Sequence, residues 1–328
     1  MRAKAWLAVF GAASVVIAAC GSKTDLLIGR NLTSAGTGGA IPEAGLPDSM
    51  PTEGGTGGVS GAPEAAGAAG TPDLVCEPVE VPPLHSLVHR YSFDGTGTVI
   101  SDSVGGAVWN GTLMGSDGSA LDGAGVLQLG GVNGYVDLPN GILSSLLAKD
   151  VTLMAWTRWP KGGSAWQRIF DFGNTTRGED PLWSVATGKA EPTYTGTTYL
   201  ATSPYTTWPP GGNVGVELKT PSTPTIHLGA ANSLKNSTLR QVTVVFEEGV
   251  GVRLYLDAQL LGSFASPLAK LSELQDLNDW LGRSQTDSDH AYNGAYAEFR
   301  IYAAALSPCA IASELAAGPD AAIVGATP

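Results

Sequence analysis

Apolar and polar side chains alternate in many short segments between Tyr91 and Tyr302. The alternation is clearest in residues 242–246, 253–257 and 295–302. A period of two is typical of β-strands that bury one face. Further strands are predicted at residues 151–158, 167–173, 182–187 and 260–264. Many short strands with glycine-rich turns predict an all-β fold of two antiparallel sheets, a sandwich or jelly roll.

Turn and helix signals complete this pattern. Gly249-Val250-Gly251 is predicted to join two strands as a hairpin, and Asp257-Ala258-Gln259 to turn into the strand that follows. Two short helices are expected. One covers Gly141–Lys149, and the other is a C-terminal helix that begins at Ser307-Pro308, where serine is a favourable N-cap and proline a favourable first helical residue.

The aromatic residues indicate where the folded core lies. The 328-residue chain contains 8 Trp, 9 Tyr and 7 Phe, and only Trp6 and Phe10 lie outside the span from Tyr91 to Tyr302. Because aromatic side chains dominate core burial, this span is the predicted folded part. We set the bounds of the domain at residues 76–317.

The segments on either side of this domain have a different composition. Residues 20–75 are rich in Gly, Pro and Ala and contain no aromatic residue, and residues 318–328 are similar. Such segments bury too little apolar surface to offset the entropy lost on ordering. We therefore predict a disordered linker before the domain and a disordered tail after it.

The first residues have the pattern of an export signal. Arg2 and Lys4 are followed by an apolar run from Ala5 to Ala19, which is too short to span a bilayer. The run ends in Ile17-Ala18-Ala19-Cys20, which resembles a bacterial lipobox with Ile in place of the usual Leu.

The lipobox resemblance implies that residues 1–19 are a signal peptide and that Cys20 carries a lipid. The alternative is an ordinary secretory cleavage site with an incidental cysteine. The next residue is Gly21 rather than Asp, which favours the outer membrane over the inner one. The expected location is therefore the cell envelope, with the lipid as the only contact with the membrane.

The charge of the chain limits its partners. The formal net charge is −12 and the isoelectric point is about 4.7. Nucleic acid binding needs a basic surface, and the sequence contains no basic stripe. We therefore exclude nucleic acid as a partner.

The predicted strands, taken in order, resemble the laminin-G-like (concanavalin-A-like) jelly-roll family of bacterial surface proteins. The matching segments are residues 89–95, 100–105, 110–113, 134–138, 151–156, 240–246, 252–257, 281–284, 293–294, 298–302 and 306–307. The resemblance implies two curved antiparallel sheets, one convex and one concave. It also implies binding of carbohydrate, protein or calcium in an adhesive or targeting module, which is an analogy of fold.

One position departs from the family pattern. In the last long strand the family usually has an acidic residue before its Glu, and in related sandwiches that acid ligates calcium. Here the residue is Ala297, and strand alternation predicts that Glu298 points to the opposite face. Calcium needs several converging oxygens, so we predict no cofactor. Asp94 and Asp102 leave a calcium ion open as the alternative.

The chain has three cysteines. With Cys20 lipidated, Cys76 and Cys309 remain, and they lie near the two ends of the domain. The termini of a jelly roll are close together, and disulfides persist in exported proteins. We therefore predict a Cys76–Cys309 disulfide, with two free thiols as the alternative.

No motif of an enzyme or of a metal site is found. HExxH and CxxC spacings are absent, and so are the GxSxG elbow and the Glu-x-Asp-x-x-Glu strand of related sandwich glycosidases. His85 and His89 are four residues apart in an extended segment, which is not a helical zinc pair. Asp287-Ser288-Asp289 has the composition of a cation loop, but we interpret it as an exposed polar turn. We predict a protein that is not an enzyme.

The stretch 191–212 is the predicted ligand-binding segment. It has no family match and is interpreted as an insertion loop with four aromatic side chains, which are Tyr194, Tyr199, Tyr205 and Trp208. Aromatic rings beside Thr and Gly suit contact with sugar or protein, and at least two of them are then expected to be exposed. The alternative is that they pack against the sandwich. The resulting hypotheses are a surface binding or adhesion module for a glycan or protein ligand, and a structural envelope lipoprotein without one.

Overall fold

The computed structural model describes residues 76, 80–83, 85–160, 163–179, 193–207, 213–230, 234 and 238–319. Three predictions lie outside the described residues. These are the signal peptide and linker with Cys20, the strand at 182–187, and all of the tail after residue 319. Within the described ranges, no helix is both long and apolar enough to cross a membrane.

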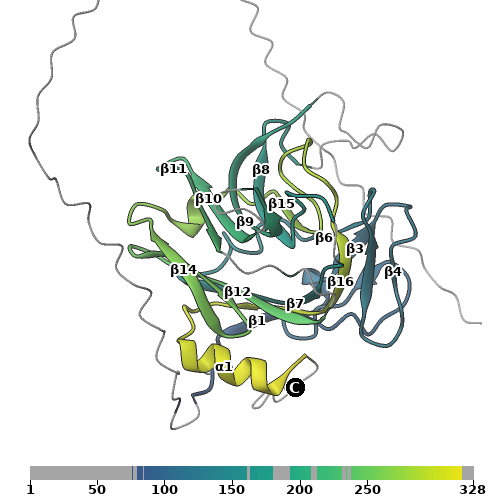
Figure 1. Cartoon of the computed structure of the whole chain (residues 1–328), viewed down its shortest axis with the longest axis horizontal. Helices are drawn as coiled ribbons and strands as arrows, with labels where there is room; N and C mark the ends of the chain where they lie inside the picture. The colour runs from purple at the N-terminus through teal and green to yellow at the C-terminus, as the bar shows by residue number, and fades with distance from the viewer. Residues whose placement is uncertain are drawn as a thin grey trace, which may run out of the picture. The chain divides into compact units, whose positions relative to one another are not determined.

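In the described part of the chain, two antiparallel sheets of eight strands each pack face to face (Figure 1). Sheet A has the order β14 (Gln259–Ala265), β13 (Gly251–Leu256), β12 (Arg240–Glu247), β7 (Val151–Arg158), β16 (Asn293–Tyr302), β5 (Leu127–Gly130) and β4 (Ala120–Leu121), and β1 (Leu87–Tyr91) also pairs with β16. Sheet B has the order β11 (Thr223–Ala230), β10 (Asn213–Thr220), β9 (Gly196–Thr206), β8 (Phe170–Thr175), β15 (Asn278–Leu281), β6 (Tyr135–Leu138), β3 (Gly111–Met114) and β2 (Val99–Ile100). The predicted all-β sandwich is confirmed.

The period-two pattern places one face of each strand in the core between the sheets. From sheet A, Leu153 of β7 and Val244 of β12 are fully buried there. From sheet B, Phe170 and Phe172 of β8 contact the ring of Phe299 of β16, with ring centroids 5.9 Å apart in both pairs. In β7, β8, β12 and β16 the core is therefore built from the residues that the alternation identifies.

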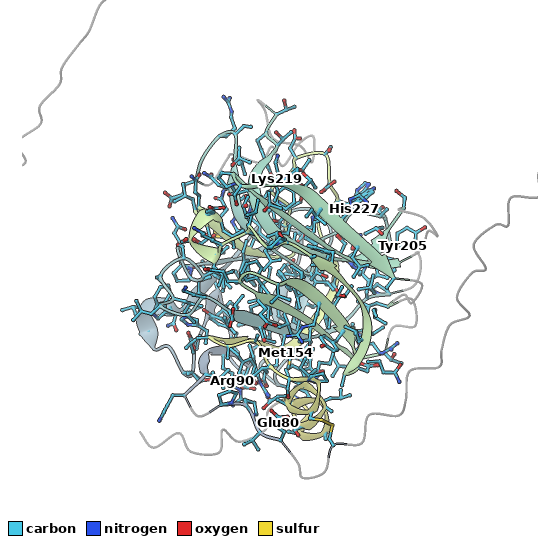
Figure 2. The ribbon with its side chains drawn as sticks, turned by 90° about the vertical axis from the view of Figure 1, so that its left-hand side faces the viewer. Glu80, Arg90, Met154, Tyr205, Lys219 and His227 are labelled. Atoms are coloured by element: carbon cyan, nitrogen blue, oxygen red, sulfur yellow. A yellow bond between two sulfur atoms is a disulfide. The ribbon has the colours of Figure 1, made fainter. Side chains whose placement is uncertain are left out.

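Helix α1 (Pro308–Ala317) covers the outer face of sheet A, and its predicted start is confirmed. The Ser307 hydroxyl accepts a hydrogen bond from the backbone N–H of Ala310 at 3.1 Å. Ile311 packs in an apolar cluster with Met154 and Trp156 of β7. Figure 2 shows Met154 and Arg90 on the side of the sandwich that carries this helix.

The predicted disulfide is present in this region. Cys76 is bridged to Cys309, which lies in the first turn of α1, and their Cα atoms are 5.4 Å apart. The bridge joins the start of the described chain to the last helix. The two cysteines are 233 positions apart in the sequence, so the bridge closes a very long loop.

The prediction that Glu298 points to the face opposite Ala297 is wrong. The register of β16 against β7 shifts between Tyr296 and Glu298, which is a β-bulge at Ala297. As a result Ala297 packs against the apolar cluster under α1, and Glu298 lies on that same face, where it accepts a hydrogen bond from Arg90 Nε at 2.6 Å. Glu298 also pairs with Arg300.

The predicted helix over Gly141–Lys149 is also wrong, because residues 140–145 form turns. The backbone makes one helical turn, with a hydrogen bond from Ser145 N–H to the Gly141 carbonyl at 2.9 Å. Leu147 is fully exposed, so a longer helix would have no continuous apolar face to bury. Among the described residues, Ala107–Trp109 and Leu271–Glu273 form short 3-10 turns.

The stretch 194–206 is not an insertion loop. Residues 196–206 form β9, a central strand of sheet B. Thr198 and Thr202 point into the sandwich with Leu200, and Thr202 satisfies its hydroxyl by donating to the Gly215 carbonyl at 2.7 Å. Because these inward positions are polar in the sequence, the alternation does not reveal the strand.

Candidate functional site

The candidate site lies on the outer face of sheet B, which points away from the core. Directly paired residues place six outward-facing positions in one line across six adjacent strands. This central row consists of Asp137, Trp280, Asp171, Ala201, Glu217 and His227, on β6, β15, β8, β9, β10 and β11. Four of the six side chains are ionisable, which is unusual for neighbouring positions in the middle of a sheet.

Arg168 joins two acids of the central row. Its guanidinium lies 3.4 Å from a carboxylate oxygen of Asp171, 3.4 Å from one of Glu217 and 2.9 Å from one of Asp289. It also donates to the hydroxyl of Ser203 at 2.5 Å. Arg168, Asp171 and Glu217 are buried and Asp289 is partly buried. We refer to these four charged residues as the Arg168 cluster.

The charges in the Arg168 cluster do not balance. Burial alone would lower the pKa of Arg168, but the three carboxylates outweigh this effect and raise it. Burial raises the pKa of Asp171 to about 7, although Arg168 acts in the opposite direction. One positively charged arginine therefore faces three carboxyl groups, and one of these, Asp171, titrates near neutral pH.

A segment that follows β15 covers the central row at Trp280 and Asp171. Arg283 lies over the ring of Trp280 at 4.0 Å and over the ring of Tyr135 at 4.7 Å. The backbone N–H of Gln285 donates to Asp171 Oδ2 at 2.9 Å. We refer to residues 283–289 as the strap. Because the strap is bound to Asp171 and, through Asp289, to Arg168, it closes the middle of this face.

Three of the four predicted ligand-binding side chains are described, and they do not form one exposed platform. Tyr194 is buried, and its hydroxyl accepts hydrogen bonds from Arg283 of the strap at 3.3 and 3.4 Å. Tyr205 is half-buried and stacks on Trp159, with ring centroids 6.0 Å apart. The expectation that at least two of the four rings are largely exposed is wrong, because Tyr194 packs under the strap and Tyr199 and Tyr205 are only partly exposed. Trp208 lies outside the described residues.

Tyr199 lies on the outer face of sheet B and remains partly exposed. The Lys219 ammonium lies 5.9 Å from the centre of its ring and donates to the Gly196 carbonyl at 2.9 Å. The Tyr199 hydroxyl forms a hydrogen bond with Thr225, and burial raises its pKa to about 12. Thr225 and His227 of the edge strand β11 are exposed. We refer to Tyr199, Lys219, Thr225 and His227 as the β9–β11 strip.

Figure 2 shows Lys219 and His227 on the side of the sandwich away from α1. Of these residues, Tyr199 was predicted from the sequence, whereas Lys219, Thr225, His227 and the Arg168 cluster were not. The cluster joins residues 168, 171, 217 and 289, which no local motif connects. The only available signal was the presence of Arg168 and Asp171 within a predicted strand, since buried strands rarely carry charges.

The oxygens considered for calcium have other partners. Asp102 pairs with His89 Nδ1 at 2.7 Å and accepts hydrogen bonds from three backbone N–H groups, and Asp94 accepts one from the Ser92 hydroxyl at 2.6 Å. Asp289 of the considered cation loop pairs with Arg168. In the described part of the chain, no group of three or more His, Cys, Asp or Glu side chains is arranged to hold a metal ion.

Several solved structures resemble the domain, and no curated protein matches the sequence. Domain 4 of an extracellular arabinanase from Geobacillus stearothermophilus, in complex with arabinotriose, is 18% identical with a TM-score of 0.46, and the match covers 69% of this chain and 97% of that chain. The binding domain of botulinum neurotoxin DC, in complex with rat synaptotagmin II, is 12% identical with a TM-score of 0.48, covering 71% and 52%. Trypanosoma rangeli sialidase, in complex with sialic acid, is 14% identical with a TM-score of 0.49, covering 72% and 33%.

The family model gives the assignment. Residues 129–312 match the Laminin_G_3 model, which is described as the concanavalin A-like lectin/glucanases superfamily. The match spans β5 to the first half of α1, and therefore both sheets. Because it covers more than half of the 328 residues, the chain belongs to the laminin-G-like family of the concanavalin A-like lectin/glucanases superfamily.

Proposed function

We propose that the domain is a binding module for carbohydrate and that its ligand contacts the β9–β11 strip. The supporting observation is that the strap closes the middle of the outer face of sheet B, whereas Thr225 and His227 are exposed and Tyr199 and Lys219 are partly exposed. A sugar site combines apolar ring surface with a few fixed hydrogen-bonding groups. The strip supplies a phenol ring, an ammonium held by Gly196, a hydroxyl and an imidazole.

Binding, rather than hydrolysis, is the activity that fits the acids of the central row. Glycosidases place two carboxyl groups on either side of the bond that they cleave. Asp171 and Glu217 are 1% and 6% exposed, and both are ion-paired with Arg168. In this arrangement neither carboxyl group reaches a sugar on the surface.

The proposed location follows from the sequence. The lipobox at Ile17–Cys20 supports a lipid on Cys20, and Gly21 supports the outer membrane. The domain would then act as a surface-anchored adhesion module. A protein is the alternative class of ligand to a glycan.

The experiment is a glycan-array screen of the purified full chain, followed by titration of the strongest ligand. Thr225→Arg places a bulky charged side chain on the strip and is expected to weaken binding by about tenfold or more, which is about 1.4 kcal/mol. Ser263→Arg introduces the same side chain at an exposed position of β14 in the other sheet. This matched control is expected to bind like the wild type.

Two results would contradict the proposal. If the chain binds no glycan, the structural envelope protein becomes the better explanation. If a glycan binds equally well to both variants, the domain is a lectin whose site lies elsewhere, and the β9–β11 strip is the wrong surface.

A further inference from the structure

Three loops at one end of the sandwich carry four exposed apolar side chains. Leu147 lies between β6 and β7, Val250 in the β12–β13 hairpin, and Leu268 and Leu277 between β14 and β15. Leu147 is fully exposed, and Leu268, Val250 and Leu277 are 66%, 55% and 40% exposed. A large exposed apolar patch marks a contact with a membrane or a protein, so the question is whether these loops present one surface. We refer to these four side chains as the loop tips.

Hydrogen bonds hold the three loops side by side. The Gly141 N–H donates to the Asp276 carbonyl at 2.7 Å, which joins the first loop to the third. The Glu248 N–H donates to Asp150 Oδ1 at 2.9 Å, which joins the first loop to the hairpin. The Ser266 N–H donates to the Val250 carbonyl at 3.0 Å, which joins the hairpin to the third loop. The loop tips therefore project from one surface.

Two of the loop tips are followed by the same residues. The sequences are Leu147-Ala148-Lys149 and Leu268-Ala269-Lys270, and both lysines are exposed. A lysine beside an inserted leucine keeps its ammonium in water while its aliphatic part lies along apolar surface. Glu248, which lies 3.7 Å from Lys149, and the partly exposed Glu273 offset this positive charge. Contact through this surface therefore depends on apolar burial rather than on charge.

The described chain enters the sandwich at the same end. Thr152, the second residue of β7, pairs with Tyr302 and accepts a hydrogen bond from the Leu306 N–H at 3.0 Å. Cys309 follows three residues later and is bridged to Cys76. Residues 1–75 precede Cys76. A lipid anchor at Cys20 would therefore be connected to the domain at the end that carries the loop tips.

We propose that the loop tips insert into the surface of the lipid bilayer that holds the chain, an inference that rests on the proposed lipid at Cys20. Insertion would fix the orientation of the domain. The turn between β10 and β11 is tied to the same surface, because the Ser222 hydroxyl donates to the Leu268 carbonyl at 2.9 Å. The β9–β11 strip would then lie beside the membrane and not at the far end of a free tether.

The test is hydrogen exchange of the full lipidated chain in vesicles of phosphatidylethanolamine and phosphatidylglycerol. Amides of residues 144–149 and 266–270 are expected to exchange about tenfold more slowly in the wild type than in the Leu147→Ser/Leu268→Ser variant, which corresponds to about 1.4 kcal/mol. The matched control is Leu239→Ser/Leu260→Ser, which changes two leucines that are 45% and 48% exposed outside these loops. It is expected to exchange like the wild type, and added salt is expected to change little because apolar burial is not screened.

The inference would be overturned if these amides exchanged equally fast in the wild type and in the Leu147→Ser/Leu268→Ser variant. It would also be overturned if the Leu239→Ser/Leu260→Ser control lost as much protection at these amides as the Leu147→Ser/Leu268→Ser variant. If Cys20 carries no lipid, the same three chains are mixed with the same vesicles and sedimented. The inference then requires more wild type than loop-tip variant in the pellet, and an equal distribution would reject it. The glycan titration uses no lipid, so it succeeds or fails independently.

Discussion

Asp279 is the residue whose electrostatic environment is hardest to reconcile with a charged side chain. It is fully buried at the end of the core, where its Oδ2 accepts a hydrogen bond from the Ile142 N–H at 3.3 Å. Burial, followed by the neighbouring carboxyl of Asp276, raises the pKa of Asp279 well above its usual value. A buried carboxyl beside another acid is more stable protonated than charged. We therefore expect Asp279 to be neutral in the folded domain.

This expectation gives a pH dependence of stability. An aspartate in an unfolded chain has a pKa near 3.9, and the folded-state pKa of Asp279 lies above it. The domain therefore loses stability as the pH rises from about 4 toward the folded-state pKa. Asp279→Asn mimics the protonated form, so it is expected to raise the melting temperature at pH 8 by roughly 3–6 °C, or about 1–2 kcal/mol, and to leave it unchanged at pH 4.

Thermal unfolding between pH 4 and pH 8 checks this prediction, with the exposed Asp94→Asn as the control. A lower melting temperature of Asp279→Asn at pH 8 would show that the charge is needed, as it would be for a bound cation. That result would revive the calcium alternative at a position that the sequence does not suggest.

At the scale of elements, the sequence predicts the strands whose inward positions are apolar. The strand expected at 151–158 coincides with β7, and those expected at 242–246 and 295–302 lie within β12 and β16. β9 was missed because its inward positions include threonines whose hydroxyls bond to carbonyl oxygens of neighbouring segments. Hydrophobic alternation does not detect a buried side chain that is polar and satisfied.

The bulge at Ala297 and the Arg168 cluster were missed for another reason. Each depends on how strands far apart in the sequence pair, and a one-residue register shift moves a side chain to the other face. The ends of the domain were easier to predict from the sequence. Ser307-Pro308 is a local capping signal, and Cys76 and Cys309 can form only one disulfide with each other once Cys20 is assigned to the lipid. Local signals therefore predicted the fold, whereas the site required the pairing of β8, β9, β10 and β11.

The disulfide provides a prediction for the attachment of α1. In the chain-entropy model a bridge across a loop this long stabilises by at most roughly 5 kcal/mol, and measured values are typically about 2–4 kcal/mol. Cys76→Ser is expected to lower the free energy of unfolding by an amount in that typical range. Urea unfolding at equilibrium is the measurement.

Cys309→Ser and the double variant Cys76→Ser/Cys309→Ser are the controls for this experiment. Both are expected to match Cys76→Ser, because all three lose the same bridge. If the double variant proved much less stable than either single variant, the thiols would be contributing separate packing interactions. The prediction that they act only as one disulfide would then be wrong.

At the scale of the whole molecule, the two outer faces of the sandwich differ in what covers them. α1 and the ion pairs of Glu298 and Arg300 close the outer face of sheet A. On sheet B the strap closes the central row at Trp280 and Asp171 and leaves the β9–β11 strip accessible. Contact with a ligand is therefore expected at sheet B, while the disulfide and the loop tips lie where the chain enters the domain.

The proposed lipid anchor at Cys20 would fix the domain to a membrane, and it gives the last prediction. A lipobox needs its cysteine, because the thiol is the acyl acceptor. Cys20→Ser is therefore expected to abolish labelling of the chain by a fatty-acid probe and to release it from the envelope fraction. Cys76→Ser, which removes a cysteine from the domain, is expected to be labelled like the wild type. Labelling that persists in Cys20→Ser would place the lipid elsewhere. Labelling absent from the wild type would leave an ordinary secretory signal, and the loop tips would then be the remaining means by which the domain reaches a bilayer.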